Sequence, residues 1–318
     1  MPLTAHQLLV VTGKGGVGKT TIAAGLASAF AVAGRRTLVL EVDPRENAHR
    51  MLGVPPSGGQ VTEAASRLWL QNLRPRDVLD GIVREQVRVG PIARRVLESE
   101  VYRHFAEGAP GLKELAVLGH ALRMLRGVET LRGRRRGGAA GRGARPEVDV
   151  VLLDAPATGH GLATLLAPRL VADTVRQGPF AELAGQLAAF VDDAARCGVV
   201  VVTAAEEMPM QEGLELLARL RAELSREAAA VVVNALHPPW PAGEGKPPPS
   251  DRLGRLWRER RAVNERELAR LRAAWRGPTV ELPMLAEPSG PELLARLRPP
   301  LAALVAAPAG SPSGAGAA

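Results

Sequence analysis

The sequence predicts an α/β fold with a doubly wound, mainly parallel sheet. Short Val- and Leu-rich runs recur along the chain with little polar alternation, as in strands whose two faces are both covered. Segments with helical spacing lie between these runs, and this alternation is typical of parallel sheets with helices on both faces. Hydrophobic residues make up 46% of the 318 residues, which is enough to form a full core.

Each core element is predicted from its own run of residues. The six core strands are expected at Leu8–Thr12, Thr37–Val42, Val148–Leu153, Val199–Thr203, Ala230–Asn234 and Thr279–Leu282. The clearest helices between them are Thr20–Ala33, Met210–Glu223 and Asp251–Trp275. A further helical pair is expected at Leu162–Val175 and Phe180–Ala195, after the third core strand.

The second and third core strands are too far apart in the sequence for a single crossover helix. About a hundred residues separate them, which predicts a helical insertion over 73–131. Within this gap we expect an extra strand at Leu68–Asn72 and helices near Asp77–Val89, Ile92–Phe105 and Leu112–Leu131.

The composition excludes several classes of protein. Aromatic residues are 3% of the chain, too few for the stacking platforms that bind single-stranded nucleic acid, so nucleic acid is not an expected partner. Cys197 is the single cysteine, which excludes an intrachain disulfide and a multi-cysteine zinc site within one chain. The sequence shows neither a signal-peptide pattern nor an apolar stretch of about 18 residues. We therefore expect a cytoplasmic protein without a transmembrane segment.

Most of the net charge of +8 comes from one loop. Residues 132–147 contain six arginines and one glutamate, a local charge of +5. Their glycine content and lack of aromatic residues predict a flexible connector, and a peripheral contact with anionic membrane stays open. We expect one domain over 1–305, which includes this loop and the insertion, and a disordered tail over 306–318.

A glycine-rich stretch follows the first predicted strand and opens the first helix. It matches G-x-x-x-x-G-K-[ST], the pattern of a phosphate-binding P-loop, in the strand-to-helix context that the motif requires. Backbone N–H groups of such a loop surround phosphate oxygens, the lysine contacts the β- and γ-phosphates, and the hydroxyl can ligate Mg²⁺. The predicted nucleotide-binding residues are Gly13, Lys14, Gly15, Gly16, Val17, Gly18, Lys19, Thr20 and Thr21.

The use of lysine in this chain supports the P-loop prediction. Only four of the 41 basic residues are lysines, and two of them, Lys14 and Lys19, lie in the loop. The planar guanidinium of arginine cannot replace the compact ammonium group that contacts phosphate there. Lys19 is therefore a predicted catalytic residue. An ordinary P-loop does not need Lys14, which is either a solvated loop residue or a group with a special role.

Two carboxylates directly follow predicted strands, at the sheet edge where nucleotides bind. Asp43 either positions the attacking water near Mg²⁺ or caps a helix that has Pro44 in its first turn and Glu46 in a capping box. Asp154 ends an apolar strand as a Walker B carboxylate does, and Gly159 in the next loop is a candidate hinge. The predicted metal-binding residues are Thr20, Asp43 and Asp154.

The segments GKGGVGKTT, DPRENAH and DAPATGHGL together resemble the ArsA family of deviant Walker A (SIMIBI-type) P-loop NTPases. This family includes the arsenite-pump ATPase and the tail-anchored-protein targeting ATPase. Val233–Leu236 resembles the family's V-N-x-L segment, and Thr203–Glu212 is similar to its P-E-x-x-x-x-x-E stretch. The resemblance implies an ATPase that uses ATP and Mg²⁺, with Asn234 contacting adenine. It also implies a homodimer in which Lys14 reaches the partner's ATP and Asp43 activates water.

The departures from the family pattern limit what the resemblance implies. The chain lacks the Cys-x-x-Cys pair of the eukaryotic targeting ATPase, and Cys197 alone cannot reproduce the cysteines of the arsenite pump. Arg45 and Glu46 are inserted before Asn47 in the first switch segment. We expect an ATP-hydrolysing homodimer whose opening and closing acts on a client protein or a pump partner. The alternative is a ParA/MinD-like positioning ATPase on membrane or DNA, although VDPRE in place of D-x-D-P-Q favours the ArsA side.

Overall fold

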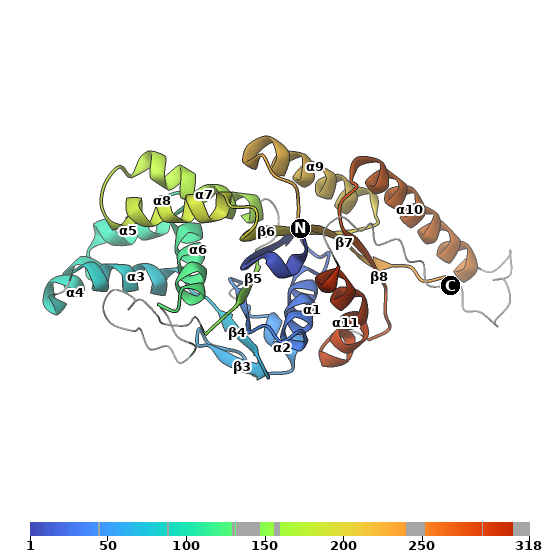
Figure 1. Cartoon of the computed structure of the whole chain (residues 1–318), viewed down its shortest axis with the longest axis horizontal. Coiled ribbons are helices and arrows are strands. Elements are labelled where there is room, and N and C mark those ends of the chain that lie inside the picture. Colours follow the sequence, from blue (N-terminus) through green and yellow to red (C-terminus); the bar gives the residue numbers. More distant parts are fainter. Residues whose placement is uncertain are drawn as a thin grey trace.

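The computed structural model has a central sheet covered by helices on both faces (Figure 1). It describes residues 1–43, 45–87, 89–128, 131, 147–155, 160–239, 252–287 and 289–307. Pro44, Pro156–Gly159, most of the Arg/Gly-rich loop and most of the predicted tail lie outside the described residues. The predicted hinge at Gly159 therefore lies outside them as well. The doubly wound α/β prediction is confirmed.

The strands form one sheet of eight within the described residues, in the order β3-β4-β2-β5-β1-β6-β7-β8. Every neighbouring pair is parallel except β3 with β4. The strands are β1 (Leu8–Gly13), β2 (Thr37–Glu41), β3 (Thr62–Ala65), β4 (Leu68–Asn72), β5 (Val150–Asp154), β6 (Cys197–Ala204), β7 (Ala230–Leu236) and β8 (Thr279–Pro283). The six predicted core strands and the extra strand at Leu68–Asn72 are confirmed, and each of their ends lies within two residues of its predicted position.

One face of the sheet is covered by the first and last long helices of the chain. The 3-10 turn η1 (Leu3–Ala5) and the helices α1 (Lys19–Val32), α2 (Ala48–Leu52) and α11 (Pro291–Ala306) lie on this side. Ten of the 14 residues of α1 are buried, because the sheet covers one side of the helix and α11 covers another. The close approach of α11 requires a glycine at position 25, where a Cβ would lie 2.5 Å from Leu301 Cδ1.

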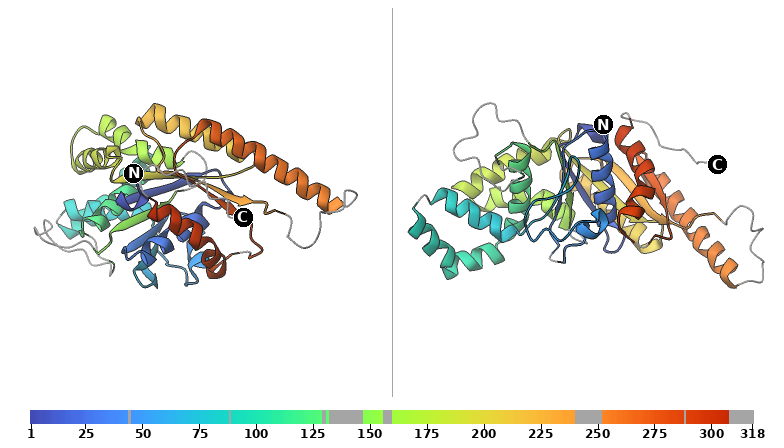
Figure 2. Two further views of the ribbon diagram at one scale, coloured as in Figure 1. Left: turned by 45° about the vertical axis from the view of Figure 1, so that its right-hand side comes forward. Right: turned by 90° about the horizontal axis from the view of Figure 1, so that it is seen from below.

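The other face carries the remaining helices. They are α3 (Pro75–Gln86), α4 (Gly90–Glu98), α5 (Glu100–Gly108), α6 (Leu112–Leu125), α7 (His160–Thr174), α8 (Pro179–Asp192), α9 (Glu207–Leu224) and α10 (Arg252–Ala274). Helices α3 to α8 form a group at one side of the molecule, and α10 projects from the opposite side (Figure 2). None of the helices in the described residues is long and apolar enough to cross a membrane.

The predicted helix over Ile92–Phe105 is wrong, because the chain breaks at Ser99. Ser99 is extended (φ −69°, ψ 143°), and its side chain accepts a hydrogen bond from the Tyr102 N–H as the cap of α5. Serine competes well for such a capping position, and its hydroxyl satisfies an N–H that has no partner within the helix. The apolar spacing continues across the break, which is why the break is not visible in the hydrophobic pattern.

Two further predictions need correction. The helix predicted over Leu112–Leu131 ends at Leu125, where Gly127 takes a left-handed φ of 68° and the Val128 N–H bonds back to Arg123 O at 2.9 Å. The edge strand β3 was not expected, since its four residues TEAA have little β-propensity. It is held by antiparallel pairing with β4 and by Ala64, which packs against the core.

The sheet brings distant residues together at the carboxyl ends of its central strands. Asp154, the last residue of β5, pairs in register with Glu41 of β2 on one side and Val11 of β1 on the other. The P-loop follows β1, and Asn234 lies near the end of β7. The candidate site is therefore assembled at this edge from residues more than two hundred positions apart.

Leu301→Ala tests the contact between α11 and α1. Leu301 is fully buried against α1, so the truncation leaves a cavity and should lower the free energy of unfolding by about 2–5 kcal/mol. Urea unfolding followed by circular dichroism measures the change. Val32→Ala, at a residue that is 70% exposed on α1, is the matched control and should change the stability by less than about 0.5 kcal/mol. A negligible effect of Leu301→Ala would show that α11 does not stabilise α1.

Candidate functional site

The P-loop is held in shape by close contacts with β6 and β7. A Cβ at position 13 would lie 2.0 Å from Val202 O, so only glycine fits beside β6. Gly18 has a φ of 91°, and a Cβ there would lie 2.4 Å from Asn234 Nδ2. Gly18 precedes α1 and provides no side-chain cap, so the first N–H groups of α1 lack a capping side chain. Such a helix start attracts an anion.

Lys19 is a buried cation in the centre of this loop. Its ammonium Nζ donates to Lys14 O at 2.9 Å, and the residue is 8% exposed. Burial lowers the pKa of Lys19, while the charge of Asp154 raises it and offsets part of that effect. A partly desolvated ammonium beside open N–H groups is stabilised by a phosphate, which supplies the missing negative charge.

Thr20 and Asp154 are in direct contact although 134 residues separate them. The Thr20 hydroxyl donates to Asp154 Oδ2 at 2.6 Å. The other oxygen, Oδ1, is buried and has no hydrogen-bond partner among the described residues. The pKa of Asp154 is raised to about 7, chiefly by burial. The charges of Glu41 and Asp43 contribute to this rise, while the Thr20 bond and the charge of Lys19 act against it. An oxygen in this position is suited to accept from a metal-bound water.

Asp43 does not cap a helix. The predicted helix start at Asp43 and Pro44 is wrong, since α2 begins at Ala48. Asp43 Oδ1 instead accepts from the Arg45 N–H at 2.8 Å, and Glu46 takes a left-handed φ of 45°. The Glu46 carboxylate turns away and accepts from the Ser57 N–H at 2.7 Å. The two inserted residues therefore form a turn in front of α2.

Glu41 is a site residue that the sequence reasoning missed. It is 1% exposed, and its Oε1 accepts from the N–H groups of Asn47 at 2.6 Å and Ala48 at 3.1 Å, which open α2. Burial raises the pKa of Glu41, and these hydrogen bonds lower it. Asn72 completes the network by donating to Asp43 O at 2.5 Å and to Glu41 Oε2 at 3.4 Å. The sequence signal that could have identified Glu41 as a site residue is its position two residues before Asp43.

Asn234 and Lys14 are placed at the rim of the P-loop. Asn234 Nδ2 donates to Val17 O at 2.9 Å, so this side chain ties β7 to the loop. Lys14 Nζ lies 2.7 Å from Glu212 Oε1 on α9 of the same chain. Both members of this ion pair are partly exposed, so it contributes about 1 kcal/mol or less. The sequence analysis included Glu212 only as the last residue of the Thr203–Glu212 stretch and gave it no role of its own.

The comparison with protein families explains this arrangement. The family model of the anion-transporting ATPases (ArsA ATPases) matches residues 6–182, more than half of the chain. The chain belongs to the ArsA family. The matched part of this ArsA-type protein holds the P-loop, both carboxylates of the strand ends and the helices from α3 to α7.

Its relatives are similar over different lengths. The ATPase BagA of Mycobacterium tuberculosis is 28% identical over 246 residues, which are 73% of this chain and 66% of the relative. The ATPase GET3C of Arabidopsis thaliana is 27% identical over 51% of this chain and 41% of its own length. The chromosome partitioning protein ParA of Myxococcus xanthus is 56% identical over 53 residues, which are 16% of this chain and 19% of ParA.

Asp154→Asn should change how the stability of the nucleotide-free ArsA-type protein depends on pH. The folded state holds the Asp154 proton more tightly than the unfolded chain, so this stabilisation is complete below about pH 4 and lost as the pH rises through about 7. Asparagine stays neutral throughout. The free energy of unfolding of the variant minus that of the wild type should therefore increase by about 2 kcal/mol between pH 5 and pH 8.

Urea unfolding at the two pH values measures this difference. Asp149→Asn is the matched control, because the bond to Arg36 lowers the pKa of Asp149 and the carboxylate form stabilises the fold. This control should be less stable than the wild type by a similar amount at both pH values. A difference for Asp154→Asn that stays constant from pH 5 to pH 8 would contradict the raised pKa of Asp154.

Proposed function

We propose that this ArsA-type protein hydrolyses ATP as a Mg²⁺-dependent homodimer and uses the cycle to act on a client protein. The observation that supports the proposal most is the set of charges buried without complete partners at one edge of the sheet. Lys19 is buried with a backbone carbonyl as its acceptor, and one oxygen of Asp154 has no partner in the part of the chain that the structure describes. Triphosphate oxygens and a hydrated cation would complete both groups.

Each residue of the proposed site has a separate task. The P-loop N–H groups and Lys19 bind and orient the phosphates, and Thr20 and Asp154 would hold Mg²⁺. When bound, Mg²⁺ neutralises charge on the β- and γ-phosphate oxygens. Asp43 would orient the attacking water, with its carboxylate held by the Arg45 N–H. Glu41 and Asn72 are positioning residues, because Asn72 holds the carbonyl of Asp43 and Glu41 holds the backbone N–H groups that follow it.

The proposed dimer requires Lys14 to leave Glu212. In the single chain the ammonium group of Lys14 faces this carboxylate at 2.7 Å. The pair is partly exposed and weak, so a γ-phosphate of the facing subunit can compete for the lysine. A cation supplied from the partner subunit to a transferring phosphoryl group raises the rate by about 10³–10⁵. ATP hydrolysis would then depend on closure of the dimer.

Mixing two inactive variants tests this proposal. Lys14→Ala should lower turnover by about 10³ with ATP still bound, and Lys19→Ala should abolish turnover. In a mixed dimer, the Lys14→Ala subunit keeps its own Lys19 and receives Lys14 from its partner. Phosphate release should therefore return when the two variants are combined, up to about half the wild-type rate per mixed dimer.

The control mixture combines Lys14→Ala with the double variant Lys14→Ala/Lys19→Ala, which has no Lys14 to supply. It should stay inactive. Recovery in both mixtures, or in neither while Lys14→Ala still binds ATP and forms dimers, would show that Lys14 does not act across the dimer. Unchanged turnover in Lys14→Ala alone would lead to the same conclusion.

The proposed client surface lies on α4 and α5. Five of the eleven large apolar residues that the described part of the chain exposes fall between positions 89 and 105. These residues are Val89, Ile92, Val96, Val101 and Phe105. A cleft of about 570 Å³ opens beside them, with Val87 and Leu97 in its lining. Apolar surface concentrated on one segment is typical of a protein-binding site. We propose that the insertion over 73–131, within an ATPase domain over 1–305, contacts the client.

Ile92→Ser combined with Val101→Ser tests this surface. Both side chains are exposed, 54% and 80%, so the fold should tolerate the change. Affinity for a dansyl-labelled, leucine-rich helical peptide of about 20 residues should fall at least tenfold, because each buried side chain contributes about 1.5–3 kcal/mol. Fluorescence anisotropy measures the affinity. Val32→Ser, on the exposed side of α1, is the control and should bind as the wild type does.

A second candidate function is ATP-driven positioning on membrane or DNA. The observation that favours it is the 56% identity to the Myxococcus xanthus ParA over 53 residues. Salt-sensitive binding to DNA or anionic vesicles, together with no binding of the apolar peptide, would select this candidate. Because no helix of the described residues can span the membrane, we propose a cytoplasmic location for either function.

A further inference from the structure

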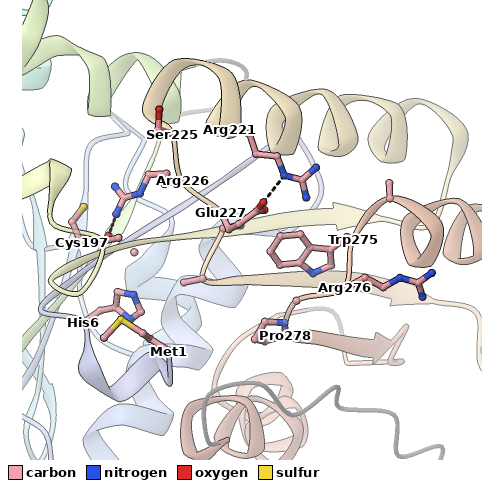
Figure 3. A pocket seen from close by; sticks show the side chains of 16 residues that line it. Met1, His6, Cys197, Arg221, Ser225, Arg226, Glu227, Trp275, Arg276 and Pro278 are labelled. Carbon is pink, nitrogen blue, oxygen red and sulfur yellow. Dashed lines mark hydrogen bonds and ion pairs between the residues drawn. The ribbon is translucent and has the colours of Figure 1, made fainter.

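We propose that a second cleft, at the opposite edge of the sheet from the P-loop, binds a small organic anion with an apolar body. The cleft has a volume of about 670 Å³ and lies where β1, β6, β7 and β8 begin. The turns that follow α9 and α10 form its wall (Figure 3). Clefts of about 300–1,000 Å³ are the size that small ligands occupy.

The cleft is separate from the nucleotide site. The P-loop follows the carboxyl end of β1, whereas His6 in the cleft precedes its first residue. A parallel strand of six residues spans about 20 Å, so β1 separates the two sites by that distance. The proposal therefore does not depend on the function proposed above.

Arginine dominates the charge of the cleft. Its lining includes Arg221, Arg226 and Arg276 and one carboxylate, Glu227, a net charge of +2. Arg221 is paired with Glu227 at 2.6 Å. Arg276 is exposed and has no ion-pair partner among the described residues. Figure 3 shows the Arg276 side chain extending past Trp275 and away from Arg226, so its guanidinium lies at the outer end of the cleft. There it can bind a carboxylate or phosphate group with two parallel hydrogen bonds.

Arg226 adds a buried positive charge. It is 9% exposed and donates to two backbone carbonyls, Val191 O at 2.9 Å and Cys197 O, rather than to a carboxylate. Among the described residues no ion pair neutralises this guanidinium, which lies beside Cys197 in the cleft. The pKa of His6, which also lines the cleft, is lowered by burial and by the charges of the N-terminal amine and Arg226. The positive potential would stabilise a bound anion, and partial exclusion of water from the site would strengthen this attraction.

Trp275 supplies an apolar wall and a hydrogen-bond donor. It is 5% exposed, and its indole Nε1 is buried with no acceptor among the residues that the structure describes. The ring lies directly over Gly277, where a Cβ would be 2.1 Å from Trp275 Cζ2, so the glycine allows this ring position. A buried donor without a partner costs about 1–3 kcal/mol. A small shift of the ring would let a ligand oxygen accept this hydrogen bond.

The rest of the cleft is suited to a neutral, unreactive body. Alanine, glycine and proline residues contribute most of the remaining lining. Cys197 also faces the cleft, but burial raises the pKa of its thiol to about 11, so it stays protonated at neutral pH. The site therefore offers no thiolate for a metal or for covalent chemistry. Apolar walls with a few cationic groups and one indole N–H favour a flat organic anion.

The test uses protein labelled with ¹⁵N at the tryptophan indoles, with Trp275→Phe to assign the signal. The probes are 2-naphthoate, 2-naphthyl phosphate and the neutral isostere 2-naphthamide. We expect at least one of the two anions to shift the Trp275 signal with saturation at millimolar concentration or below. The neutral amide should bind at least tenfold more weakly. The anion with the higher affinity identifies the head group as carboxylate or phosphate.

Two surface variants on the same stretch of chain keep the test independent of folding. Arg276→Gln should weaken binding of the anion about tenfold, the effect of losing one charge-assisted contact. Arg272→Gln is the matched control, because Arg272 pairs with Glu281 and does not line the cleft, and it should bind as the wild type does. Absence of a Trp275 shift, equal affinity for the amide, or equal weakening by both variants would overturn the proposal.

Discussion

The contact between Thr20 and Asp154 is the interaction on which the nucleotide site depends. It joins the start of α1 to the end of β5 across 134 residues. The carboxyl group involved has a pKa of about 7, raised chiefly by burial. Lys19 lies beside it with its own charge partly desolvated. The fold thus keeps two groups in an unfavourable electrostatic state, which the proposed phosphate and Mg²⁺ would relieve. A ligand that completes the interactions of these incompletely solvated groups would therefore be bound more tightly.

Much of this arrangement could be predicted from the sequence, because its signals are local. The strands are continuous apolar runs, and the P-loop is a contiguous motif whose glycines are required by geometry at positions 13 and 18. Asp154 was predictable from its place at the end of a strand. Parallel strands that alternate with helices bring such positions to one edge of the sheet, so the location of the site follows from the fold class.

The features that could not be predicted are those decided by contacts between distant segments. Glu41 accepts from the N–H groups that open α2 and from Asn72, and the contact with Asn72 forms only because β2 pairs with β4. Glu212 meets Lys14 because α9 packs near β1. The break at Ser99 results from a capping bond that competes with a continuous helix, and apolar spacing carries no information about that competition. Roles in binding and catalysis also need a ligand and remain predictions.

The packing of α11 against α1 has a consequence for the order in which the protein can mature. Helix α1 is buried on nearly all sides, and part of its cover is α11, the last helix of the described chain. During synthesis, the helix that starts at the P-loop is made early but waits for residues 291–306 before its outer side is covered. The apolar outer side of α1 therefore stays uncovered until residues 291–306 have been made. Because α11 follows β8 in the chain, every strand of the described sheet is synthesised before this cover is in place.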